Sequence, residues 1–177
     1  SSAENLSASI ASGEVVKDRA VLAESATESI GKIAFIAEKN ELQFFAKDNP
    51  TKPITLTPQN CKWFKKDSVE YVSVKNNSNG PAVKQFFKVH FNSPKIKLLE
   101  YMNPSFMPDG NNIGFIKPNE EFITLIVGFG IKKKLGKYFE DCEAVSKKAR
   151  DGEFGGAFSN KKIADYTALC EEYTNCK

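Results

Sequence analysis

The sequence predicts an α+β protein: an antiparallel β-sheet body of about eight strands, followed by a C-terminal helical cassette. From about residue 31 to residue 128, short runs of apolar and aromatic residues are separated by turn residues, as in a meander of strands. No strand–helix–strand rhythm interrupts this part, which disfavours a doubly wound α/β fold. The period then changes to that of one helical stripe, at Ile131, Leu135, Tyr138 and Phe139.

We expect one structural domain with three parts. Residues 1–12 are mostly Ser, Ala, Asn and Glu, and predict a disordered leader. Residues 13–128 form the antiparallel β body, although the stretch 13–30 reads ambiguously and only weakly favours a strand. Residues 129–177 form the helical cassette, packed on the β body.

The strand-like runs are short and closely spaced, so consecutive strands are expected to pair antiparallel in an open curled sheet or a small barrel. In order they are residues 32–36, 42–47, 54–57, 63–64, 69–74, 83–91, 95–101, 113–116 and 122–127. In the longest run, alternation predicts that Phe87 and Val89 face the core and that Lys88 and His90 face solvent.

The C-terminal part predicts three helices. The first carries the apolar stripe on one side and a row of lysines on the other. Asp141 is placed to cap the second, which runs to about Arg150 and closes at Gly152. Asn160 is placed to cap the third, which runs to about Tyr173.

Composition excludes several classes of function. The chain has 177 residues, and its net charge of +3 is too small to predict a nucleic-acid partner. No apolar run approaches the roughly 20 residues of a membrane span, so we predict no transmembrane segment. The sequence begins Ser-Ser-Ala-Glu-Asn without Met, which is typical of a mature protein after removal of a leader and favours export.

The four cysteines point to a disulfide rather than to a metal site. Their spacing contains no CxxC pattern, and the chain has one His, so we predict no metal ligands. We predict a disulfide between Cys142 and Cys176, which would imply an oxidising compartment, with Cys61 and Cys170 buried as free thiols. Two alternatives stay open from sequence: a Cys142–Cys170 bond, or free cysteines throughout.

No arrangement of residues predicts catalysis or a cofactor. Cys61 and His90 would need mutual contact and a third, orienting group to act as nucleophile and base, and the sequence supplies none. Gly128-Phe129-Gly130 opens the first helix and could hold a phosphate. Lys133 stands where GxGxxG needs its third Gly, however, so a simple strand-to-helix joint is favoured.

The sequence contains two pairs of adjacent acids, Glu120-Glu121 and Glu171-Glu172. Both pairs are predicted to lie on the solvated surface. We therefore predict no catalytic, cofactor-binding or metal-binding residue, and no cofactor.

Five segments carry a resemblance to a known group of proteins. They are Gly31-Lys32-Ile33, the run Pro53 to Pro58, Phe86-Phe87 with the run Ile96 to Tyr101, the run Lys134 to Cys142 with its Tyr-Phe-Glu-Asp-Cys end, and Tyr173-Thr174-Asn175-Cys176. In these the chain resembles an uncharacterised family of exported cell-envelope proteins of Bacteroidetes, from about Gly31 to Cys176. It departs from the pattern by inserting Thr174 between Tyr and Asn. The resemblance implies a periplasmic, outer-surface or secreted location and implies no activity.

Three functional hypotheses follow. The first is an exported, non-enzymatic structural or interaction module with a protein partner. The second is a β body that binds a small apolar ligand on its Phe-rich faces, which a deep apolar pocket would favour. The third is a hydrolase, which a cluster of perturbed titratable groups in a cleft would favour.

Overall fold

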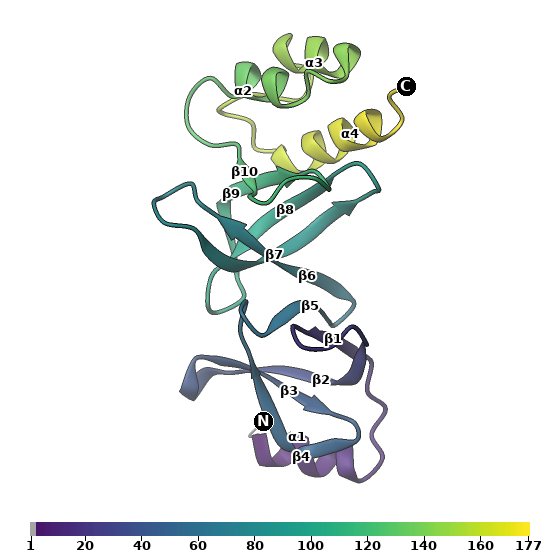
Figure 1. Ribbon diagram of the computed structural model, residues 1–177. Helices are drawn as coiled ribbons and strands as arrows, with labels where there is room; N and C mark the ends of the chain where they lie inside the picture. The colour runs from purple at the N-terminus through teal and green to yellow at the C-terminus, as the bar shows by residue number, and fades with distance from the viewer. Residues whose placement is uncertain (1–2) are drawn as a thin grey trace. The chain divides into compact units, whose positions relative to one another are not determined.

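The computed structural model describes residues 3–177 and has the predicted α+β class, with a mostly N-terminal sheet followed by helices (Figure 1). Ten strands form one open antiparallel sheet, in the order β10-β9-β8-β7-β6-β5-β1-β2-β3-β4, so the sheet does not close into a barrel. The strands are β1 Asp18–Leu22, β2 Ser29–Ile36, β3 Glu41–Ala46, β4 Asn49–Leu56, β5 Cys61–Lys66, β6 Val69–Asn76, β7 Val83–Asn92, β8 Lys97–Met102, β9 Pro108–Ile116 and β10 Thr124–Leu125. The helices are α1 Ala3–Ala11, the 3₁₀ turn η1 Ala37–Lys39, α2 Ile131–Tyr138, α3 Glu143–Arg150 and α4 Lys162–Thr174.

The described residues divide into two compact units, and the division differs from the predicted one at residue 128. The N-terminal unit comprises the chain up to Val74 with Lys84–Lys88 and Met102–Pro108. The C-terminal unit comprises Lys75–Val83, Val89–Tyr101 and Asp109–Lys177. The last strands therefore belong with the helices, because their apolar side chains share a core with them.

The expectation of a disordered leader is wrong for residues 3–11, which form α1; residues 1 and 2 lie outside the described residues. Ile10 is buried, and it packs with Val16 and Phe45 on one face of the sheet, with Leu6 at the edge of this cluster. The segment is rich in Ser and Ala, so only its few apolar residues reveal the amphipathic face, and burial against β3 stabilises it.

The N-terminal unit buries both faces of its strands. Phe44 and Phe45 are successive residues of β3 and point to opposite faces, each into a separate apolar cluster. At Gly31 of β2, a Cβ atom would lie 2.2 Å from the Phe45 carbonyl oxygen, so only glycine fits against β3 there. Asp18 is buried and accepts backbone N–H groups from Ile33 (2.7 Å) and Asp67 (3.1 Å), which ties β1 to its surroundings.

Strand β7 follows the predicted alternation only in part. Phe87 is fully buried as expected, and Val89 is half-buried. The neighbouring Phe86 is also buried, and His90, expected to face solvent, has only 15% of its side chain exposed. The prediction for His90 is wrong because Glu100 of β8 lies opposite it and its carboxylate accepts a hydrogen bond from His90 Nε2 at 2.8 Å.

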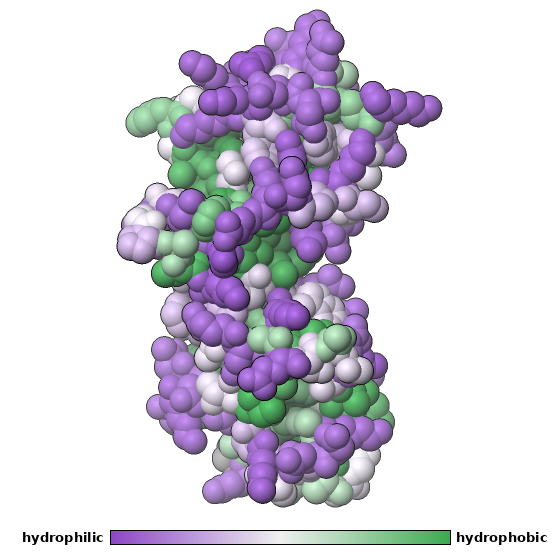
Figure 2. All heavy atoms as spheres, viewed as in Figure 1, coloured by the Kyte–Doolittle hydropathy of each residue, from purple (hydrophilic) through white to green (hydrophobic). Residues whose placement is uncertain are grey.

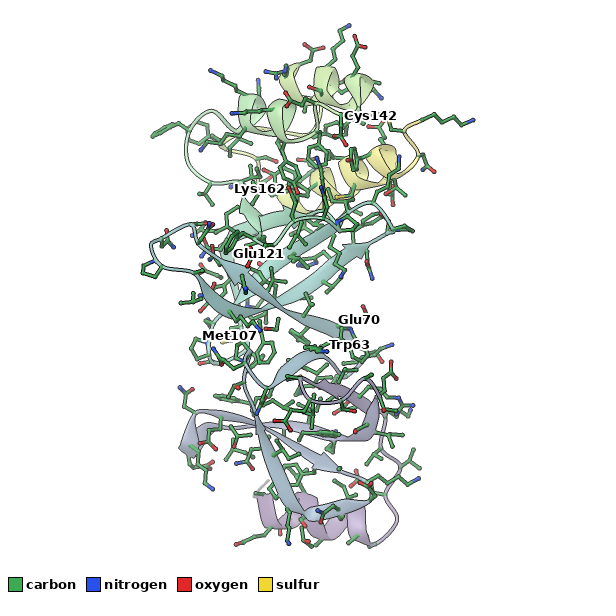
Figure 3. All side chains as sticks on the ribbon, viewed as in Figure 1. Trp63, Glu70, Met107, Glu121, Cys142 and Lys162 are labelled. Carbon is green, nitrogen blue, oxygen red and sulfur yellow. A yellow bond between two sulfur atoms is a disulfide. The ribbon has the colours of Figure 1, made fainter. Side chains whose placement is uncertain are left out.

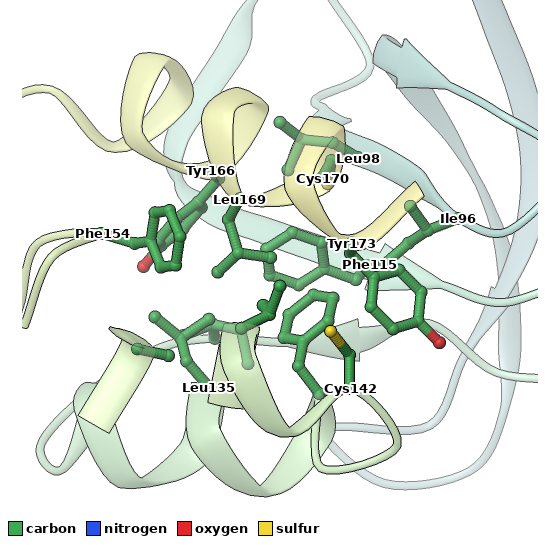
Figure 4. Packing of buried hydrophobic residues seen from close by; sticks show 14 of the residues in the cluster. Ile96, Leu98, Phe115, Leu135, Cys142, Phe154, Tyr166, Leu169, Cys170 and Tyr173 are labelled. Atoms are coloured by element: carbon green, nitrogen blue, oxygen red, sulfur yellow. The ribbon is translucent and has the colours of Figure 1, made fainter. Parts of the chain in front are cut away.

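The three predicted C-terminal helices are present and enclose the core of the C-terminal unit. α2, α3 and α4 lie together beside β8, β9 and β10 (Figure 1). Side chains from strands and helices interdigitate between them, and Figure 4 shows Phe115, Leu135, Tyr166 and Leu169 in this cluster. Neither predicted cap is formed: Cys142 and Lys161 hold the cap positions of α3 and α4, without side-chain cap hydrogen bonds.

Candidate functional site

The predicted disulfide is present between Cys142, just before α3, and Cys176, just after α4. The Cα atoms lie 6.2 Å apart and the residues are 34 positions apart in sequence. Cys61 and Cys170 are buried and free, as predicted. Near the bond, the Lys95 ammonium donates to the Cys176 carbonyl oxygen at 2.6 Å, which holds the end of the chain against the turn before β8.

A cluster of one lysine, two tyrosines and two acids lies beside the disulfide; we call it the lysine–tyrosine site. It consists of Lys117, Glu120, Tyr138, Asp141 and Tyr173. Its lysine is the centre: the ammonium donates to the Tyr138 carbonyl oxygen at 2.7 Å and to the Asp141 carboxylate at 3.3 Å. The same ammonium lies 4.4 Å from the Tyr138 ring centroid and 5.3 Å from that of Tyr173, within range of cation–π attraction.

The two phenols of the site are held protonated. The Tyr138 hydroxyl donates to Glu120, and the Tyr173 hydroxyl donates to Asp141. Burial raises the pKa of both tyrosines, and the neighbouring carboxylates raise it further. Burial also acts to raise the pKa of Asp141, but hydrogen bonds from Tyr173 and the charge of Lys117 outweigh it and lower that pKa. At neutral pH the site therefore offers neutral phenols and a charged carboxylate.

A cavity of about 630 Å³ opens beside this site and the disulfide, whose Cys142 is labelled in Figure 3. Charged and polar residues dominate its wall, including Lys95, Lys137 and Glu140. Each polar group of the site already has a partner within the chain. The cavity is therefore not the deep apolar pocket that a binder of small apolar ligands would need.

Lys117→Met is expected to lower the free energy of unfolding by about 1–3 kcal/mol, because it removes the cation–π contacts, leaves the Tyr138 carbonyl without its donor and takes the neighbouring cation from Asp141. Lys137→Met is the matched control, since Lys137 is exposed and lines the same cavity; we expect a change within about 0.5 kcal/mol. Urea denaturation of both variants measures the difference. Equal effects would show that the ammonium of Lys117 is not a structural centre.

Asp141 should make stability depend on pH in the acid range. Its folded-state pKa lies below the unfolded value of about 3.9, so its contribution is full above that value and is lost as pH falls through the folded pKa. Because Asp141 is 56% exposed, we expect Asp141→Asn to cost less than about 1 kcal/mol at neutral pH. Urea titrations from neutral to acid pH should show the gap between wild type and variant closing, whereas a gap independent of pH would contradict the prediction.

The structure gives Cys61 and His90 separate partners. The Cys61 thiol donates to the Trp63 carbonyl oxygen at 3.2 Å, and burial raises its pKa to about 11, so it is a neutral thiol at physiological pH. His90 bonds Glu100 through Nε2, and Glu100 also accepts the Gly110 N–H at 3.2 Å. The nucleophile–base pair considered from sequence is therefore not assembled by these contacts.

The acidic pairs are mostly surface, with one correction. Glu121 and Glu172 are solvent-accessible and pair with Lys75 and Lys148 respectively, and Glu171 is exposed. Glu120, also predicted as solvated surface, is half-buried. Its carboxylate accepts hydrogen bonds from the Tyr138 hydroxyl and from the backbone N–H of Lys117.

Two loops of the C-terminal unit expose aromatic side chains; we call them the aromatic loops. Gly128-Phe129-Gly130 is the predicted joint between β10 and α2, and both glycines have positive φ (79° and 72°). Phe129 is 86% exposed, and Phe158, between α3 and α4, is 95% exposed. Sequence analysis did not predict that either side chain is exposed. The available signal at Phe129 was a Phe flanked by glycines, off any helical stripe.

Residues 3–177 contain neither a metal site nor a membrane-spanning helix. Within them, no cluster of three or more His, Cys, Asp or Glu is arranged to hold a metal ion. None of the helices formed by these residues is both long and apolar enough to cross a membrane.

Comparison with known proteins gives no match: no family model, no curated protein and no solved structure matches this chain.

Proposed function

We propose that this protein is an exported, non-enzymatic interaction module that docks its partner through the aromatic loops of the C-terminal unit. The observation that carries the proposal is the exposure of Phe129 and Phe158, at 86% and 95%. Burying a Phe side chain is worth about 1.5–3 kcal/mol, and aromatic side chains left in water on a folded surface are the usual anchors of an interface.

Export is supported by the Cys142–Cys176 bond and agrees with the expectation from the sequence resemblance to cell-envelope proteins of Bacteroidetes, for which the comparisons give no match. Disulfides of this kind persist outside the reducing cytoplasm. The two free thiols do not weaken this argument, since both are buried and out of reach of oxidants.

The interaction role is better supported than the two alternatives. The Phe-rich face of the N-terminal unit is filled by its own rings: Phe64 lies 4.6 Å from Tyr71 and 4.9 Å from Phe86, centroid to centroid. That packing leaves the apolar-ligand hypothesis without a supporting observation. A hydrolase would need an activated nucleophile, and burial of Cys61 works against one there.

The test is photo-crosslinking in the native cell, with a photoreactive phenylalanine analogue at position 129 or 158. We expect envelope-localised crosslinks, to a protein or to lipid, from both positions. The control is the same analogue at Met107, which is 63% exposed but belongs to the N-terminal unit. Crosslinks that are equally frequent from position 107, or absent from positions 129 and 158, would overturn the proposal.

A further inference from the structure

The aromatic loops have the chemistry of a surface that meets lipid. We propose that they dock this protein on an anionic lipid bilayer, with Phe129 and Phe158 inserted at the level of the headgroups and the neighbouring lysines on lipid phosphates. This inference rests on the proposed function and names the partner of the same surface.

The two loops lie next to each other. A methyl group added at Gly156 would lie 3.4 Å from Cε of Lys132, and one added at Gly152 would lie 2.8 Å from the same atom. Lys132 follows Phe129 by three residues, and Gly156 precedes Phe158 by two. Figure 1 shows the loop before α2 and the loop before α4 side by side, at the same side of the helices. Both aromatic side chains are therefore presented from one region of the C-terminal unit.

Lysines outnumber acids in the two segments that carry these aromatic side chains. Residues 122–139 contain four lysines and no acid, and residues 154–164 contain two lysines and no acid. Lys132, Lys133 and Lys161 are exposed. The acids that border these segments are Glu121, Glu140 and Glu153, which are exposed, and Asp165, which accepts a hydrogen bond from Ser159 at 2.8 Å. Lysines beside an anionic leaflet are attracted to it, and the attraction adds up over such a cluster.

The surroundings fit headgroups better than a protein pocket. A hot spot for a protein partner sits at the centre of a ring of contacts that exclude water. Here the residues next to the two aromatics are small or polar (Gly, Ala and Ser), and Figure 2 shows mostly hydrophilic residues over the helices, with isolated hydrophobic ones. Phe at the interface with Lys beside it is the pattern of shallow insertion.

Lys134 stabilises the loop that carries Phe129. Its ammonium donates to the Val127 carbonyl oxygen at 2.6 Å, across the turn that carries Phe129. It is therefore left unchanged in the variants below, so that the conformation of the loop is preserved.

The experiment is co-sedimentation of the whole protein with vesicles of phosphatidylcholine alone or mixed with phosphatidylglycerol. We expect binding only to the mixed vesicles, weakened by added salt. The double variant Phe129→Ser/Phe158→Ser should bind at least about tenfold more weakly, and Lys132→Gln/Lys133→Gln several-fold more weakly. Met107→Ser is the matched control, as an exposed apolar residue of the N-terminal unit, and should bind as wild type does.

A fluorescent reporter places the loop in the bilayer. Phe129→Trp should be quenched by brominated lipid in mixed vesicles, while the chain's only native tryptophan, Trp63, should not be quenched in the wild type. All the substituted positions are exposed, and circular dichroism of each variant establishes that the fold is retained.

Failure of wild type to bind mixed vesicles, or wild-type affinity in the double Phe variant, would overturn the membrane inference. Self-association abolished by the double Phe variant, with no vesicle binding, would also overturn it in favour of a second copy. The two proposals fail differently: crosslinks from position 129 to a protein, without vesicle binding, would reject the membrane and keep the interaction module.

Discussion

Replacing Phe139 with alanine is expected to lower the free energy of unfolding by about 3–5 kcal/mol, the largest effect that we predict for a single residue. Phe139 is fully buried. Its ring lies 5.1 Å from that of Phe115 and 5.0 Å from that of Tyr173, centroid to centroid. The cavity left by the ring would be bounded by β9, α2 and α4, which are all anchored elsewhere in the core, so the surroundings can collapse only partly.

The matched control is Phe158→Ala, which removes the same side chain where it is 95% exposed. We expect a change within about 0.5 kcal/mol. Urea denaturation followed by circular dichroism measures both variants. A loss below about 1 kcal/mol for Phe139→Ala would mean that its ring is not part of the packed core.

Cys142→Ser is expected to cost about 3–4 kcal/mol, because the disulfide closes a loop of 34 positions and restricts the unfolded chain. The fold itself should persist, since the helices that the bond joins also share the apolar core with β8 and β9. Denaturation of the wild type with and without reductant gives the same quantity without a substitution.

Cys176→Ser provides the internal check on this prediction. If both substitutions act by removing the same disulfide, the free energy of unfolding of the double variant should be no lower than that of the less stable single variant. Non-reducing peptide mapping of protein from its native cell should recover the Cys142–Cys176 linkage. A linked peptide that contains Cys61 or Cys170 would contradict the pairing, and four free thiols would remove the physical support for export.

Features that depend on near neighbours in the chain could be read from the sequence. The apolar stripe from Ile131 to Phe139 predicted α2 because a helix places i, i+4 and i+7 on one face whatever lies opposite. The antiparallel pairing followed from short strands joined by short turns, whereas the sequence allowed either an open sheet or a small barrel, and the structure shows an open sheet. The Cys142–Cys176 bond could be favoured over its alternatives, since each cysteine flanks one end of a predicted helix.

The tertiary structure alone decided which polar groups are buried and which apolar ones are not. Asp141 had the position of a helix cap in the sequence. Its carboxylate instead accepts hydrogen bonds from Tyr173 and Lys117, both distant in sequence, within the lysine–tyrosine site. His90 is shielded from solvent because it bonds to Glu100 on the next strand. Phe129 is left in solvent because the glycines on either side turn the chain away from the core. In each case the contact partner, or the direction of the side chain, is set by a backbone path that no local pattern specifies. Whether a group is buried and hydrogen-bonded depends on the free energy of the whole fold relative to exposure to water. Periodicity depends only on a residue's neighbours in the chain.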